Sequence, residues 1–294
     1  MRISRLLACT CLALTTTVVS AAVAPSVPAV EVLPASPDLL IGRIEAAITG
    51  DLLDVARDLI ARSAATLPPQ QVVRLSAEYA LASGSPEDAA NGFATLTSDP
   101  VLGGNAQLGL GLARLRLGQN AQAITALDAA LAINPGSVRG WIARGVAADR
   151  GRDWPNAETA YAKALALEPA SASAYTNRGY SQLLRGRFVE AAADSARALA
   201  IDPKSDVARN NLRLAQAMQG DYKNAFKGST KLTMARDLNT VGFAAMSRGD
   251  YGIAETFFTR AMQSNPQFDR IAWDNLVYLK QLAHKPIDPG VALK

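Results

Sequence analysis

The sequence repeats at a fixed interval of 34 residues, and this period restricts the possible folds more than any other feature. Three prolines and three glycines keep the interval: Pro135, Pro169 and Pro203, and Gly111, Gly145 and Gly179. A period of this length is typical of antiparallel helix pairs that stack in a row. We therefore expect an all-α chain built from such pairs.

Residues 138–171 show how one period specifies a helix pair. Apolar residues recur at helical spacing on both sides of a central turn, which predicts two helices packed against each other. We expect Gly145 to allow a close approach opposite Ala157, with small residues on both helices. Gly151 is expected in the turn, where a positive φ suits glycine. Pro169 ends the second helix because proline cannot continue it.

This pattern is typical of the tetratricopeptide repeat (TPR), so we expect a TPR α-solenoid with a C-terminal capping helix. The predicted units lie near 38–69, 70–103, 104–137, 138–171, 172–205, 206–234 and 235–268, followed by a capping helix at 270–283. In the cap, Trp273 and Leu276 are expected to cover the apolar face of the last unit, so that Trp273→Ala would cost about 3–5 kcal/mol.

Unit 206–234 departs from the pattern. Its turn glycine, Gly220, is followed by the next one, Gly249, after 29 residues instead of 34. The second half contains Gly228, Ser229 and Thr230, which are weak helix formers. Arg213 also replaces the expected small residue, so we expect irregular packing in this unit.

The N-terminus resembles an export signal. Residues 1–22 combine Arg2 and Arg5 with an apolar run and small residues, which predicts a signal peptide cleaved near Val23. A retained signal anchor is the main alternative, and lipidation at Cys9 remains open. Residues 23–37 are expected to form a Pro/Ala-rich linker and 284–294 an irregular tail. We therefore expect a periplasmic or outer-membrane-associated protein with no stable membrane span after signal removal.

Composition argues against several functional classes. Both cysteines, Cys9 and Cys11, lie in the signal segment, so the mature chain is expected to lack thiols. The net charge of +4 includes Arg2 and Arg5. Without these two residues the chain has 28 basic and 26 acidic residues, and this near balance argues against a nucleic-acid partner. His284 is the single histidine. We predict no enzyme activity, no metal site and no cofactor.

The first helix of each unit is expected to line a concave groove that binds a protein segment. Asn177 and Asn211 lie 34 residues apart, and asparagine can both donate and accept hydrogen bonds along a peptide backbone. The predicted groove residues are Arg150, Asn177, Tyr180, Asn210, Asn211, Leu214, Met218, Asn239, Phe243 and Met246. The double change Asn177→Ala and Asn211→Ala is expected to weaken binding and to leave the fold intact, because neither residue is predicted to fill the core.

Three stretches resemble a particular family of TPR proteins. They are WIARGVAADRGRDWPNAETAYAKALAL at 141–167, TNRGYSQLLRG at 176–186 and ARNNLRLAQAMQG at 208–220. They are similar to the TadD family of the tight-adherence (Flp-type) pilus locus, over roughly residues 75–220. The resemblance implies an envelope protein that supports assembly of a secretin or pilus machine, and such proteins commonly carry a lipid anchor. This chain lacks a clear lipid-attachment motif.

Three functional hypotheses follow. The first is a non-enzymatic TPR adaptor of the cell envelope that assists pilus or secretion-machine assembly. The second is a general periplasmic interaction scaffold unrelated to pili. The third is a TPR arm of an envelope-biogenesis enzyme complex, although the repeats leave little room for a catalytic domain.

Overall fold

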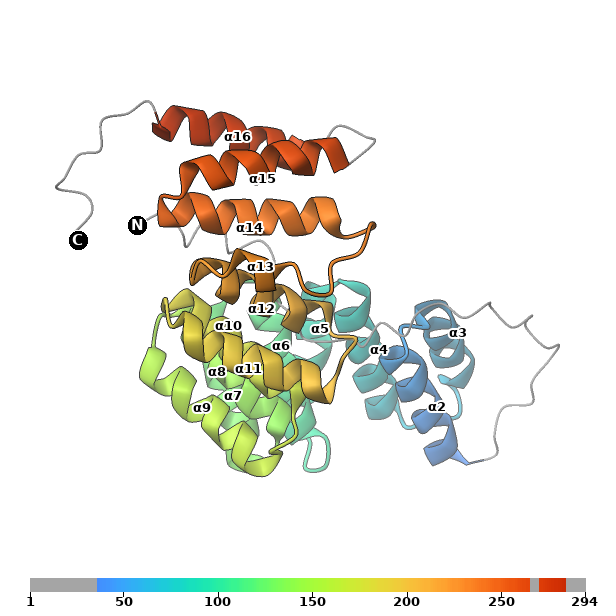
Figure 1. Ribbon diagram of the computed structural model, residues 1–294. Helices are drawn as coiled ribbons and strands as arrows, with labels where there is room; N and C mark the ends of the chain where they lie inside the picture. The colour runs from blue at the N-terminus through green and yellow to red at the C-terminus, as the bar shows by residue number, and fades with distance from the viewer. Residues whose placement is uncertain (1–35, 265–269, 284–294) are drawn as a thin grey trace. The chain divides into compact units, whose positions relative to one another are not determined.

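The computed structural model describes residues 36–264 and 270–283, and every regular element in these ranges is an α-helix. The predicted fold class, an all-α solenoid of antiparallel helix pairs, is confirmed. The described residues fall into two compact units, 36–174 and 175–283, whose boundary lies within α10 (Ala172–Leu184). Figure 1 shows the helices of both units, each of which is described by itself.

The N-terminal unit consists of four helix pairs and the start of α10. Its helices are α2 (Pro37–Thr49), α3 (Leu53–Ser63), α4 (Pro69–Ser83), α5 (Pro86–Ala94), α6 (Gly103–Arg116), α7 (Asn120–Ile133), α8 (Val138–Arg150) and α9 (Trp154–Leu167). The most extensive contacts join α6 to α7 and α8 to α9, so neighbours in sequence are also partners in space. A continuous core of alanine and leucine side chains runs from α4 through α8.

The C-terminal unit holds the rest of α10 and six further helices. They are α11 (Phe188–Ile201), α12 (Asp206–Met218), α13 (Tyr222–Ala225), α14 (Met234–Arg248), α15 (Tyr251–Ser264) and α16 (Arg270–Ala283). Helices α14 and α15 make the closest pair, and α16 packs on α15. A side chain caps the N-terminus of α12, where Ser205 accepts a hydrogen bond from the Ala208 amide at 3.2 Å. Ser137 caps α8 of the N-terminal unit in the same way, by accepting from the Gly140 amide.

The repeated glycine makes room for a side chain of the second helix. A Cβ added to Gly145 would lie 2.6 Å from the ring of Tyr161, sixteen residues later. The same sixteen-residue spacing joins Gly111 to Leu127, Gly179 to Ser195 and Gly242 to Phe258. At Gly111 and Gly179 an added Cβ would also lie 3.4 Å from the carbonyl oxygen of an alanine one period away from Ala157. Each glycine therefore accepts a side chain from the second helix of its own pair.

The turn between paired helices differs from the prediction. Gly151 has an ordinary φ of −79°, and the neighbouring Arg152 has a positive φ of 58°. Gly118 lies one period before Arg152, Gly186 and Gly220 lie one and two periods after it, and all three take a positive φ. The left-handed position of the repeat is thus the residue after Gly151. It is a glycine in most of the described turns, but it is Arg152 here, and Asp51 takes a positive φ of 59° in the turn between α2 and α3.

Unit 206–234 has a very short second helix, as its weak helix formers predict. Helix α13 spans only Tyr222–Ala225, whereas α9 and α15 each contain 14 residues. Residues 226–233 follow as turns. Arg213 reaches into the space beside this segment and is 2% exposed.

The capping helix α16 covers its neighbour with one of the two predicted residues, Leu276, but not with Trp273. Ala272, Leu276 and Leu279 are buried and contact the core of α14 and α15. Trp273 is 47% exposed, so the expectation that it covers the apolar face is wrong. Trp273 lies about 100° from the buried Ala272 around a helix with 3.6 residues per turn, which places the indole at the side of the buried face.

Several predicted segments lie outside the described residues. These are the signal peptide at 1–22 with both cysteines, nearly all of the linker at 23–37, and the tail at 284–294 with His284. Within the described ranges, the model contains no helix with the length and apolar character that a membrane crossing requires.

Candidate partner-binding surface

Nine of the ten predicted groove residues lie in the C-terminal unit, on the first helices of three consecutive pairs. Helix α10 carries Asn177 and Tyr180; α12 carries Asn210, Asn211, Leu214 and Met218; α14 carries Asn239, Phe243 and Met246. Helices α12 and α14 contact each other directly. Arg150, at the end of α8, belongs to the N-terminal unit.

Asn211 holds two repeats together inside the protein. It is 4% exposed, and its amide nitrogen donates a hydrogen bond to the Thr176 carbonyl on α10 at 3.2 Å. The expectation that Asn211 lies outside the core is therefore wrong. A buried amide that satisfies a helix carbonyl contributes to stability, since leaving either group unpaired would cost about 1–3 kcal/mol.

The other groove residues divide by burial. Asn239 and Met246 are buried in α14, at 9% and 6% exposure. Six residues are half-buried and so remain accessible to a partner: Asn177, Tyr180, Asn210, Leu214, Met218 and Phe243. This mixture of amide and apolar groups can accompany a peptide backbone and also contact its side chains.

Apolar members of this set are held in place by the core beneath them. Leu214 packs against two neighbouring clusters, one with Leu183 and Ala191 and the other with Ala217 and Val241. Contacts on both sides restrict the rotamers of a half-buried leucine, which lowers the entropy lost when a ligand covers it.

Arg150 uses its guanidinium to join successive repeats. Its Nη1 donates to the Leu115 carbonyl in the last turn of α6, and Arg116 makes the same bond to the Leu81 carbonyl of α4. In the C-terminal unit, Arg248 donates to the Met218 carbonyl of α12 at 2.7 Å. We call these three contacts the arginine clasps. A cation at a helix C-terminus satisfies an orphan carbonyl and interacts favourably with the helix dipole.

Sequence reasoning did not find these clasps, although a signal existed. Arg116 and Arg150 lie 34 residues apart at the ends of first helices, where a cation has a carbonyl within reach. The sequence pattern instead predicted that Arg150 contacts a segment bound in the groove.

A buried ion pair supports the irregular unit. Arg213 Nη2 lies 2.9 Å from Asp237 Oδ2; the Arg213 side chain is 2% exposed and the Asp237 side chain is 0% exposed. Arg213 also donates to the Ala225 carbonyl at 3.0 Å and to Asn210 Oδ1 at 2.8 Å. Burial lowers the pKa of the Arg213 guanidinium, and the charge of Asp237 opposes this shift. The sequence indicated irregular packing here but not the carboxylate partner, which comes from the next helix.

The described ranges contain no cluster of three or more His, Cys, Asp or Glu residues arranged to hold a metal ion. The buried Tyr161 hydroxyl donates to Asp149 Oδ2 at 2.7 Å, and burial raises the pKa of this tyrosine well above its usual value. This pair lies within the helix pair α8–α9 and serves its packing.

Comparison with protein families identifies the repeat. Residues 75–138 and 142–206 match the family model described as tetratricopeptide repeat. No curated protein sequence matches the chain.

Solved structures with the same fold are distant in sequence. A chain of the APC/C hetero-tetramer Cut9-Hcn1 matches with a TM-score of 0.66 and 15% identity, over 84% of this chain and 49% of that one. A tetratricopeptide repeat protein from Parabacteroides merdae matches with a TM-score of 0.56 and 15% identity, over 83% and 98%. This chain thus spans about half the length of the Cut9-Hcn1 chain, and likeness at this identity shows the fold alone.

Proposed function

Because this chain is a tetratricopeptide repeat protein, we propose that it is a non-enzymatic adaptor that binds a segment of a partner protein along the first helices of its repeats. The observation that carries the proposal is the half-buried amide and apolar lining of α10, α12 and α14. Its contact residues are Asn177, Tyr180, Asn210, Leu214, Met218 and Phe243.

We further propose that the adaptor works in the bacterial cell envelope and assists assembly of a pilus or secretion machine. The signal-like residues 1–22 and the resemblance to the TadD family support this proposal. The alternative is a periplasmic scaffold unrelated to pili, which the same helix lining would serve equally well.

The binding proposal is tested with a variant that changes only half-buried residues. Asn177→Ala combined with Met218→Ala removes one amide and one apolar contact, which together should weaken binding at least tenfold, since about 1.4 kcal/mol is a factor of ten. Crosslinking of the full chain in envelope extracts first identifies the partner. A titration of that partner against wild type and variant then measures the affinity.

Two further variants serve as controls. Asn91→Ala changes an exposed amide on α5 and should leave both affinity and stability unchanged. Asn211→Ala should lower the free energy of unfolding, because it removes the bond to the Thr176 carbonyl. Equal affinity of wild type and the Asn177/Met218 variant would reject the helix lining. Recovery of no pilus or secretion-machine subunit would favour the general scaffold.

A further inference from the structure

The short second helix of unit 206–234 leaves a surface of unusual chemistry. Lys223, Lys227 and Lys231 are all exposed, and none forms an ion pair with any residue in the described ranges. Leu232, which follows Lys231 in sequence, is 97% exposed, more than any other large apolar residue the structure describes. We call these four residues the lysine surface.

The lysine surface lies in the most basic part of the chain. Unit 206–234 contains five basic and two acidic residues, whereas 70–103 contains one basic and four acidic residues. Of the acidic groups nearby, Asp206 pairs with Arg209 at 2.8 Å, and Asp237 pairs with Arg213. Asp221 accepts hydrogen bonds from Asn224, which lower its pKa, and the charges of Lys227 and Lys223 lower it further. The three lysines therefore supply the excess positive charge.

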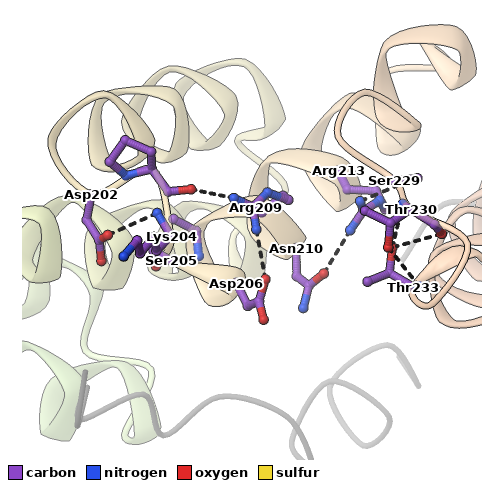
Figure 2. A network of polar contacts seen from close by, with 12 residues as sticks. Asp202, Lys204, Ser205, Asp206, Arg209, Asn210, Arg213, Ser229, Thr230 and Thr233 are labelled. Carbon is purple, nitrogen blue, oxygen red and sulfur yellow. Dashed lines mark hydrogen bonds and ion pairs between the residues drawn. The ribbon is translucent and has the colours of Figure 1, made fainter. Parts of the chain in front are cut away.

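Specific contacts hold this segment against the helices beneath it. Phe226 meets Phe257 of α15 edge to face, with ring centroids 5.3 Å apart. Figure 2 shows the polar contacts, in which Arg213 reaches Ser229 Oγ at 3.3 Å and the Thr230 amide donates to Thr233 Oγ1 at 3.0 Å. Because both ends of the segment are fixed, the lysines and Leu232 are presented from a defined backbone.

We propose that the lysine surface docks an acidic segment of a protein partner, with an apolar side chain of that segment placed on Leu232. The proposal rests on the adaptor function above and adds a second contact region outside the half-buried lining of α10, α12 and α14. Complementary charge would steer the acidic segment and Leu232 would contribute contact area. Exposed pairs are individually weak and screened by salt, so binding should depend on all three lysines and fall as ionic strength rises.

The test uses the full chain and a fluorescently labelled peptide of alternating glutamate and leucine. The variant Lys223→Gln, Lys227→Gln, Lys231→Gln should bind this peptide at least tenfold more weakly than wild type. Leu232→Ser should weaken binding by about threefold, as expected for losing one partly covered apolar contact. The matched control, Lys163→Gln with Lys204→Gln, changes exposed lysines elsewhere and should bind as wild type does.

Further measurements distinguish binding at the lysine surface from binding at the lining of α10, α12 and α14, and a protein partner from other anionic partners. The Asn177/Met218 variant should bind the acidic peptide normally, so failure of either surface is visible independently of the other. Equal binding of the peptide by the triple variant would overturn the proposal. So would tighter binding of anionic lipid vesicles or of a single-stranded oligonucleotide than of the peptide, because the surface would then recognise negative charge on another class of partner.

Discussion

The regular pair 138–171 and the irregular unit 206–234 fill the same internal space in opposite ways. In the regular pair the first helix contributes Gly145 and the second contributes the ring of Tyr161. In the irregular unit the first helix contributes Arg213 and the position sixteen residues later is Ser229. The large side chain is on the first helix instead of the second, in the unit whose second helix ends at Ala225.

This exchange changes what each unit depends on. Tyr161 finds its hydrogen-bond partner, Asp149, within its own helix pair. Arg213 brings a buried charge, and its carboxylate partner Asp237 lies on α14, in the following pair. The buried polar group of the regular pair therefore finds its partner within that pair, whereas the buried charge of the irregular unit requires the following helix.

The largest expected effect comes from breaking the ion pair of the irregular unit. Asp237→Ala leaves the Arg213 guanidinium buried without its carboxylate and should lower the free energy of unfolding by about 3–5 kcal/mol. Urea denaturation followed by circular dichroism measures the loss. The double change Arg213→Met, Asp237→Leu replaces the pair by apolar side chains and should restore most of the stability. A single variant as stable as wild type would show that the pair is not needed.

A smaller loss is expected when the regular pair is overfilled. Gly145→Ala places a Cβ 2.6 Å from the buried ring of Tyr161 and should cost about 1–3 kcal/mol. The matched control is Gly42→Ala in α2, where nothing lies within 4 Å of the new Cβ and the higher helix propensity of alanine should be slightly stabilising. Thermal unfolding of both variants checks the contrast, and equal melting temperatures would contradict it.

The smallest effect concerns the hydrogen bond that closes the regular pair. Tyr161→Phe should cost about 1 kcal/mol at neutral pH, because the Asp149 carboxylate loses a donor. Burial raises the pKa of Tyr161, so above about pH 10 the unfolded chain releases the phenol proton while the folded chain keeps it. The stability of wild type then falls with rising pH and approaches that of the variant. A gap that is unchanged or wider when the pH is raised from about 9 to about 11 would refute the assignment.

Sequence periodicity predicted the helix pairs because the positions that repeat are those where helices cross. It located the buried alanines and the irregular unit, since these depend on spacing and helix propensity. It did not identify the contact of Gly145 with the ring of Tyr161, because that contact depends on how far one helix is shifted along the other. The exposure of Trp273 was missed for a similar reason: composition marks a helix as apolar, but the rotation of that helix decides which residues are covered.

The candidate site was less predictable than the fold. Asn211 and Arg150 have the residue types expected of ligand contacts, but each donates to a helix carbonyl of a preceding repeat. A polar side chain near a helix end can bind either a partner or the backbone, and sequence alone does not distinguish the two uses. The lysine surface became visible only when the length of α13 and the exposure of Leu232 were known.

The direction of the arginine clasps along the chain has a consequence for folding during synthesis. Each clasp reaches backward, from the end of one first helix to the end of the first helix before it: Arg116 to Leu81, Arg150 to Leu115, and Arg248 to Met218. The residue that supplies the carbonyl is synthesised before the arginine that donates to it, because chains emerge from the ribosome N-terminus first. During translation, therefore, each of the three pairs that a clasp closes has an open helix end until the next first helix has been made.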